Sequence, residues 1–192
     1  MRTADIERIT KETRISLSLN LDGGDVSVET GLGFFDHMLT ALFFYAGFGA
    51  RLTASGDLDV DAHHTVEDVG IVIGRALAEA LGDRKGIRRY WSCQIPMDEA
   101  LCSAALDVGG RAFLRYDAPM PQEFVGGYDV CLTPEFMRAF AVNAAVTLHM
   151  KAEYGDNSHH VTEALFKALG TALRYCCEIS GSSVASTKGV LS

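Results

Sequence analysis

Two segments decide the fold: residues 61–81, DAHHTVEDVGIVIGRALAEAL, and residues 158–176, SHHVTEALFKALGTALRYC. Both contain two adjacent histidines and, four residues after the first histidine, a glutamate. Apolar residues then recur at helical spacing and match between the segments at one constant offset. The matched pairs are Val69 and Leu165, Ile73 and Leu169, Ala76 and Ala172, and Leu77 and Leu173. The pattern predicts two amphipathic helices that begin at the histidines, in an internally duplicated chain.

Alternating apolar and polar residues predict strands ahead of these helices. In the first half, residues 15–21 and 26–28 flank a turn at residues 22–25, which favours a hairpin. Residues 100–108 and 112–116, separated by two glycines, form the corresponding pair in the second half. Each half therefore follows the order strand, strand, helix, strand, helix.

This order predicts an α+β fold in which each half has a sheet of roughly four strands with two helices on one face. The halves comprise residues 1–92 and 93–192, and no long Gly/Ser linker separates them. We expect the halves to pack as one compact unit, with the helices of both halves between the two sheets.

The repeated histidines and glutamates have the spacing of metal ligands. In each segment the first histidine and the glutamate share one helical face, whereas the second histidine points about 100° away. These residues are His63, His64 and Glu67 in the first segment and His159, His160 and Glu163 in the second. Each segment therefore offers ligands to two different metal ions.

Two further candidates open the preceding helix of each half, where His37 aligns with Glu135. A single histidine at a helix start is more often a cap or a satisfied core residue than a ligand. The duplication changes this balance, because five of the six histidines fall in the repeated framework. The remaining one, His149, lies in an alternating stretch, which favours a strand and a structural role.

Composition restricts the class of protein. The chain has 192 residues, of which 48% are hydrophobic and 22% are charged, as in a compact globular enzyme. A net charge of −8 argues against general nucleic-acid binding, which requires a broad basic surface. The sequence has no apolar stretch long enough to span a bilayer and begins without a signal-like segment, so we expect a cytoplasmic protein with no membrane partner.

The basic residues gather locally at residues 84–89, at Arg111 and at residues 186–189. Solvated loops are the ordinary explanation for such clusters. Arginine, however, binds phosphate through two directional hydrogen bonds, and serine, threonine and lysine can complete such a site. No nucleotide-binding glycine pattern is present in the sequence, so the phosphate would belong to a small substrate.

Over nearly its whole length the sequence resembles the imidazoleglycerol-phosphate dehydratase family in its monofunctional form. The motifs that carry the resemblance are residues 10–13, 34–38, 63–68, 98–101, 157–160, 163–164, 166–168 and 188–192. The resemblance implies a duplicated ribosomal-protein-S5-like fold, two manganese ions per active site, and a homo-oligomer of 24 subunits with sites built between subunits. It also implies dehydration of D-erythro-imidazoleglycerol phosphate to imidazoleacetol phosphate, a step of histidine biosynthesis.

Site residues follow from the same resemblance. It implies that one manganese ion is held by His37, His64, His159 and Glu163. The other would be held by His63, Glu67 and His160, with Glu135 as the fourth ligand. Many family members have histidine at that fourth position, and Glu135 also fits an ordinary helix start, so His149 is the alternative ligand. Contacts to the phosphorylated substrate are implied for Glu12, Arg89, Arg111, Ser186, Thr187 and Lys188.

The expected mechanism uses a manganese-bound imidazolate that expels the hydroxyl group and forms a diazafulvene. Glu12 would transfer the proton, although the ordinary interpretation of this residue is an exposed glutamate on a strand. The catalytic set is then Glu12, His64, Glu67, His160 and Glu163. Two alternatives remain open: a two-metal phosphoester hydrolase, and a non-catalytic assembly protein in which metal ions join subunits.

Overall fold

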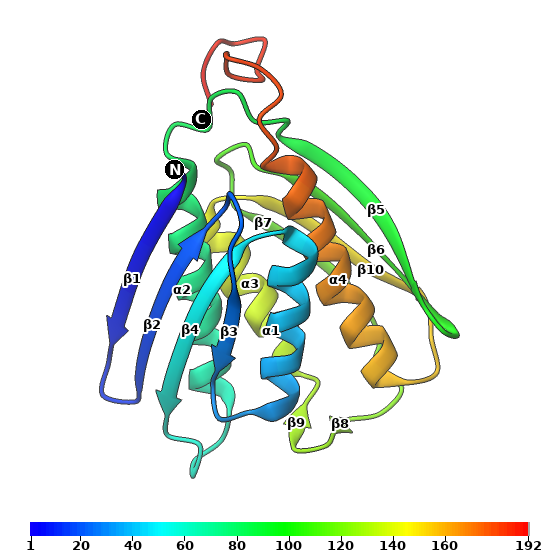
Figure 1. Ribbon diagram of the computed structural model, residues 1–192. Coiled ribbons are helices and arrows are strands. Elements are labelled where there is room, and N and C mark those ends of the chain that lie inside the picture. Colours follow the sequence, from blue (N-terminus) through cyan, green and yellow to red (C-terminus); the bar gives the residue numbers. More distant parts are fainter. Residues whose placement is uncertain (192) are drawn as a thin grey trace.

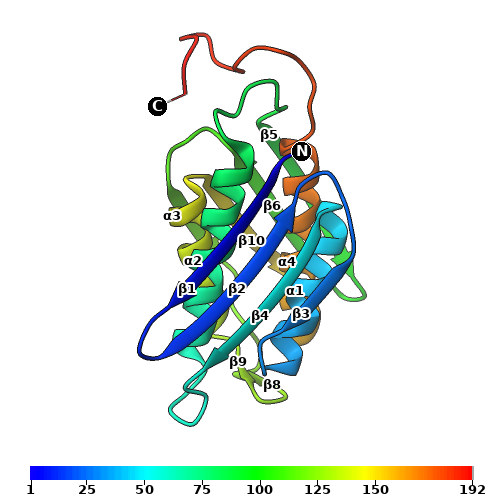
Figure 2. The ribbon, with the colours of Figure 1, turned by 60° about the vertical axis from the view of Figure 1, so that its left-hand side comes forward.

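The computed structural model describes residues 1–191, so the final residue of the second half, Ser192, lies outside it. Two four-stranded sheets enclose a layer of four helices (Figure 1, Figure 2). The first half comprises β1 Thr3–Ile9, β2 Thr13–Asn20, β3 Val26–Glu29, α1 Gly33–Ala46, β4 Gly49–Gly56 and α2 His63–Leu81. The second half comprises β5 Tyr90–Met97, β6 Ala100–Asp107, β7 Phe113–Asp117, α3 Leu132–Ala144, β10 Thr147–Tyr154 and α4 Ser158–Cys176, with a small hairpin of β8 Phe124–Val125 and β9 Tyr128–Asp129.

The two halves have the same topology. Their strand orders are β1-β2-β4-β3 and β5-β6-β10-β7, so each strand of one sheet has a counterpart in the other. Helices α1 and α2 cover one face of the first sheet, and α3 and α4 cover one face of the second. The predicted duplicated α+β fold with helices between the sheets is therefore confirmed. Strand β5 spans the expected boundary at residues 92 and 93.

Both predicted hairpins are wrong. The strand at 26–28 does not pair with the strand at 15–21, because β4 lies between β2 and β3 in the sheet. The turn at residues 22–25 instead carries the chain across the end of β4. A Cβ atom on Gly49 would lie 2.8 Å from the Cα atom of Gly24, so this crossing requires glycine.

The corresponding pair in the second half is separated in the same way. Strand β10 lies between β6 and β7, and it pairs antiparallel with β6 and parallel with β7. Within the two four-stranded sheets, the hairpins that form are β1 with β2 and β5 with β6. The alternating pattern identified β2, β3, β6, β7 and β10, but it missed β1 and β5, so each half begins with one strand more than the predicted order. The pattern also carried no information about which strands are neighbours.

In the helical layer each helix packs against a helix of the other half, and these contacts join the two halves. Helix α2 of the first half packs against α3 of the second, and α4 packs against α1. Two equivalent glycines allow these close crossings: an added Cβ would lie 2.7 Å from the Phe140 carbonyl oxygen at Gly74, and 2.4 Å from that of Leu42 at Gly170. Between the helices, the buried ring of Phe136 contacts aromatic rings from both halves. This packing brings the start of α1 beside the start of α4.

Within residues 1–191, none of the helices is sufficiently long and apolar to cross a membrane.

Candidate metal and substrate site

His37, His159 and Glu163 form one cluster where α1 and α4 begin. Their candidate ligand atoms all lie within 4.8 Å of one another. Glu163 Oε2 lies 3.4 Å from His37 Nε2 and 3.2 Å from His159 Nε2. The second contact confirms that the first histidine and the glutamate of the α4 segment share a helical face. Asn157 fixes the helix start, because its side chain accepts the backbone N–H of His159 at 2.9 Å.

The carboxylate of this cluster is ready to bind a cation. Glu163 is 9% exposed, and partial burial opposes its ionisation. The ammonium group of Lys167, 2.8 Å from Glu163 Oε1, outweighs this effect, and His37 adds to it, so the pKa of Glu163 lies below its usual value. Lys167 holds one carboxylate oxygen, and the other oxygen faces the two imidazoles.

A second set of ligands begins α2. His63 Nε2 lies 3.8 Å from Glu67 Oε2, so these residues also share a helical face. Asp61 accepts the backbone N–H of His63 at 2.7 Å, as Asn157 does in the second half. Glu135 is on the neighbouring helix α3, where its carboxylate pairs with Arg138. The duplication relates α3 to α1 and α2 to α4. Glu135 on α3 therefore has the same position beside α2 that His37 on α1 has beside α4.

The second histidine of each segment faces a carboxylate that lies outside its own segment. His64 Nδ1 lies 3.0 Å from Asp57 Oδ2, and this hydrogen bond raises the pKa of His64. His160 Nδ1 lies 2.7 Å from Glu99 Oε2, a contact that lowers the pKa of Glu99. Such contacts fix ring orientation and leave Nε2 as the nitrogen that can bind a metal ion. Sequence reasoning missed Asp57, which directly follows β4.

Glu12 lies in the turn between β1 and β2, so its interpretation as a strand residue is wrong. Its side chain is half-exposed, and Oε2 lies 3.9 Å from His64 Nδ1. The backbone carbonyl of Glu12 accepts the N–H of Asp57 at 3.1 Å. Glu12 is therefore next to a candidate metal ligand while its carboxylate remains accessible.

The predicted phosphate-binding residues line one cavity of about 580 Å³ at the other end of the molecule. Its lining includes Arg89, Arg111, Ser186, Thr187 and Lys188. The segment after α4, which contributes Ser186, Thr187 and Lys188 to the cavity, lies beyond the C-terminal ends of α2 and α4 (Figure 1). The five residues are thus brought together, but they lie far from the helix starts that carry the imidazoles.

Asp107, which sequence reasoning missed, organises this cavity. Its two carboxylate oxygens accept hydrogen bonds from Arg89 Nε at 2.7 Å and Nη2 at 3.1 Å, which raises the pKa of Arg89. Arg89 Nη1 also donates to the carbonyl of Ala185 at 2.6 Å, which fixes the start of the segment containing Lys188. Arg111 is 66% exposed, so its guanidinium remains accessible to an anion.

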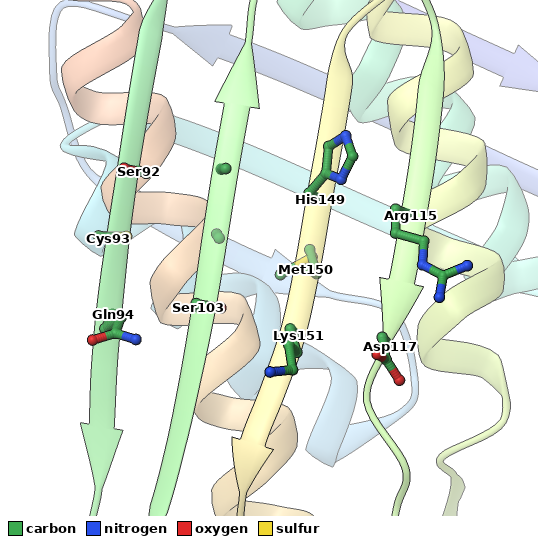
Figure 3. A pocket seen from close by; sticks show the side chains of 11 residues that line it. Ser92, Cys93, Gln94, Ser103, Arg115, Asp117, His149, Met150 and Lys151 are labelled. Atoms are coloured by element: carbon green, nitrogen blue, oxygen red, sulfur yellow. The ribbon is translucent and has the colours of Figure 1, made fainter.

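A larger cavity, about 670 Å³, is on the uncovered face of the second sheet. Figure 3 shows His149, Arg115 and Lys151 pointing away from the sheet on the side opposite the helices. His149 contacts the ring of Phe113 at a centroid distance of 5.6 Å. Volume alone therefore does not identify the site, because this cavity lacks the repeated imidazole and carboxylate groups.

Comparison with known proteins assigns this arrangement to a family. A family model described as Imidazoleglycerol-phosphate dehydratase matches residues 30–173. The chain belongs to the imidazoleglycerol-phosphate dehydratase family. The relative from Exiguobacterium sp. is 51% identical over 191 residues, which cover 98% of each chain.

Two crystal structures of imidazoleglycerol-phosphate dehydratases agree with the fold. The Staphylococcus aureus enzyme is 37% identical with a TM-score of 0.85, and the match covers 92% of this chain and 99% of that one. The Pyrococcus furiosus enzyme, in complex with (S)-C348, is 38% identical with a TM-score of 0.85, and the match covers 97% of this chain and 100% of that one. Membership of the imidazoleglycerol-phosphate dehydratase family confirms the predicted enzyme class, a hydro-lyase.

Proposed function

We propose that this protein dehydrates D-erythro-imidazoleglycerol phosphate to imidazoleacetol phosphate in histidine biosynthesis. Family membership supports this reaction. The observation that carries the proposal is the cluster of His37, His159 and Glu163, with a related set at the start of α2. Imidazole and carboxylate groups arranged in this way can hold metal ions, and metal ions can stabilise a substrate whose own imidazole ring is deprotonated.

The donor set supports two divalent cations in each site, and we propose manganese. Ionised carboxylates are suitable ligands for this hard ion, and imidazole nitrogens complete a mixed nitrogen and oxygen set. When bound, manganese would supply Lewis-acid stabilisation of the deprotonated imidazole ring. The first ion would be held by His37, His64, His159 and Glu163. The second ion would be held by His63, Glu67, His160 and Glu135.

These ligand sets require a neighbouring subunit. Figure 1 draws α2 and α4 on opposite sides of the helical layer, and each packs against a different helix, α2 against α3 and α4 against α1. His64, at the start of α2, therefore serves a cluster on α4 of another copy. His160 would reciprocate by reaching the His63 and Glu67 pair of that copy. One metal pair would thus form where the start of α4 in one subunit meets the start of α2 in the next.

The phosphate cavity adds a second argument for shared sites. Helix α4 has 19 residues and is about 28 Å long. Its first residues carry the metal ligands, whereas the phosphate cavity lies beyond its last residues. A three-carbon chain between an imidazole ring and a phosphate cannot span this distance. The phosphate pocket of a site would therefore come from a different subunit, as expected for an assembly of 24 subunits.

Different protein groups would then assist proton transfer and phosphate binding during the dehydration. Dehydration removes a hydroxyl group beside the ring and a hydrogen atom from the next carbon. Loss of the hydroxyl from the deprotonated ring gives a diazafulvene, whose adjacent hydrogen is acidic. Glu12, whose carboxylate is near the candidate ligand His64, would transfer this proton. Arg111 and Lys188 would hold the phosphate, and the enol product would tautomerise to the ketone.

The test is to incubate the manganese-loaded protein with imidazoleglycerol phosphate and to measure formation of the ketone. We expect turnover that stops after chelation and falls strongly in Glu12→Gln. The matched control is Glu7→Gln, an exposed glutamate on β1, which should keep full activity. Release of inorganic phosphate would indicate a hydrolase. Absence of both products would indicate an assembly protein, and full activity of Glu12→Gln would refute its proposed role.

A further inference from the structure

Asp68, the residue after the candidate ligand Glu67, is a buried carboxylate that the proposed reaction does not use. Its side chain is 9% exposed. Oδ2 accepts a hydrogen bond from Thr13 Oγ1 at 2.6 Å, and Oδ1 pairs with Arg8 Nη2 at 2.8 Å. Both partners belong to the β1-β2 hairpin, on the two sides of the turn that carries Glu12. Asp68 therefore fastens this turn to α2.

The hydrogen bonds beyond Asp68 lead to the backbone of Glu12. An ionised carboxylate can only accept, so the Thr13 hydroxyl donates to Asp68 and must accept from Thr10 Oγ1, 3.2 Å away. The Thr10 oxygen in turn accepts the backbone N–H groups of Glu12 at 3.1 Å and Thr13 at 2.9 Å. The carboxylate of Asp68 therefore sets the direction of the two hydroxyl hydrogen bonds, from Thr10 to Thr13 and from Thr13 to Asp68.

Burial of this carboxylate is costly for stability. A charge withdrawn from water is compensated only when its partners satisfy it fully. Here Arg8 Nε is buried and lacks a hydrogen-bond partner among the described residues. A partly buried ion pair that leaves this nitrogen without a partner contributes little to the stability of the hairpin. A positioning role for Asp68 would explain the arrangement.

We propose that Asp68 is a positioning residue that, through Thr13 and Thr10, sets the place of the Glu12 carboxylate relative to His64. The inference rests on the proposed dehydration. It assigns a common role to the parts of two sequence motifs, residues 10–13 and 63–68, that metal binding leaves unexplained. Glu12 remains the group that touches the substrate.

The main experiment compares Thr13→Val with Thr13→Ser in the full-length, manganese-loaded protein. Valine has nearly the shape of threonine but cannot donate to Asp68, whereas serine retains the hydroxyl. Because a misplaced catalytic group can lose up to about a hundredfold in rate, we expect Thr13→Val to lower kcat at least about tenfold with little change in KM. Thr13→Ser should remain close to wild type, as should Thr53→Val, an exposed control on β4.

A double variant separates positioning from general damage. If Thr13 acts through Glu12, then Thr13→Val should cause no further loss in a Glu12→Gln background. Multiplied losses would overturn the proposal, and so would full activity of Thr13→Val. Should Thr13→Val fail to fold, Thr10→Val and Thr10→Ser provide the same comparison one hydroxyl further along the chain.

Hydrogen exchange of the segment at residues 8–14 gives a readout that does not depend on turnover. We expect faster amide exchange there in Thr13→Val and Asp68→Asn than in Thr13→Ser, with metal content unchanged. If the wild-type protein does not dehydrate the substrate, the proposed function fails, and this measurement alone decides whether the network holds the turn. Equal exchange in all three variants would refute the inference.

Discussion

Substitution of Gly170 by alanine tests whether the α1-α4 crossing holds the first metal cluster together. The new Cβ atom would lie 2.4 Å from the carbonyl oxygen of Leu42 and 3.1 Å from the Cβ atom of Tyr45. The nearest neighbour is backbone, so it cannot rotate away. To restore ordinary contact the helices must separate by about 1 Å at this crossing.

The stability change combines two opposing effects. Overpacking costs about 1–3 kcal/mol, and the clash with backbone places this substitution at the upper end. Alanine recovers about 1 kcal/mol because it favours the helix more than glycine does. We therefore expect a net destabilisation of about 2 kcal/mol, which for a chain of this size lowers Tm by about 4–8 °C.

Thermal unfolding at fixed protein and manganese concentrations provides the assay. Gly33→Ala is the matched control, because Gly33 is in α1 and its added Cβ would meet no atom within 4 Å. The control should keep its Tm and its metal affinity. Gly170→Ala should also bind manganese more weakly, since α1 carries His37 and α4 carries Glu163. A Gly170→Ala protein with wild-type Tm and metal affinity would refute this account of the crossing.

Three further predictions concern metal content, assembly and pH. Glu135→Gln should weaken binding of one of the two manganese ions per chain in a metal titration, whereas His149→Ala should not. The opposite result would make His149 the ligand. Chelation should reduce the particle mass in light scattering, and an unchanged mass would exclude assembly driven by metal. The hydrogen bond from Arg2 lowers the pKa of Asp22 below the usual value for aspartate. The stability that this pair gives the folded protein is therefore complete above that usual pKa and is lost as pH falls. Asp22→Asn should therefore lower Tm near neutral pH and have less effect in acid, and a difference that grows in acid would contradict this sign.

Local structure was predictable where one pattern covered a long segment. The apolar residues after each pair of histidines repeat over several turns, and helix α4 has the predicted bounds of 158–176. Pairing of strands was not predictable in this way. Asp22–Asp25 has the composition of a hairpin turn, yet β2 gains a better partner in β4, which comes later in the chain. That choice depends on the α1 crossover and therefore on tertiary packing.

The candidate site was predictable in its chemistry and only partly in its geometry. Helical spacing gave the contact between His159 and Glu163, and the duplication related His37 to Glu135. No spacing rule could reveal that Asp57 would face His64, since the contact depends on a turn after β4. Nor could the sequence show that the imidazoles and the phosphate cavity lie at opposite ends of one subunit.

Subunit complementation tests the central claim, a metal pair shared between the start of α4 in one subunit and the start of α2 in another. His159→Ala and His63→Ala damage different contributors, so each protein alone should be inactive. Mixed and reassembled together, they should regain activity at about one quarter of the sites, where both contributors are intact. Failure to regain activity in verified mixed assemblies would contradict the shared site.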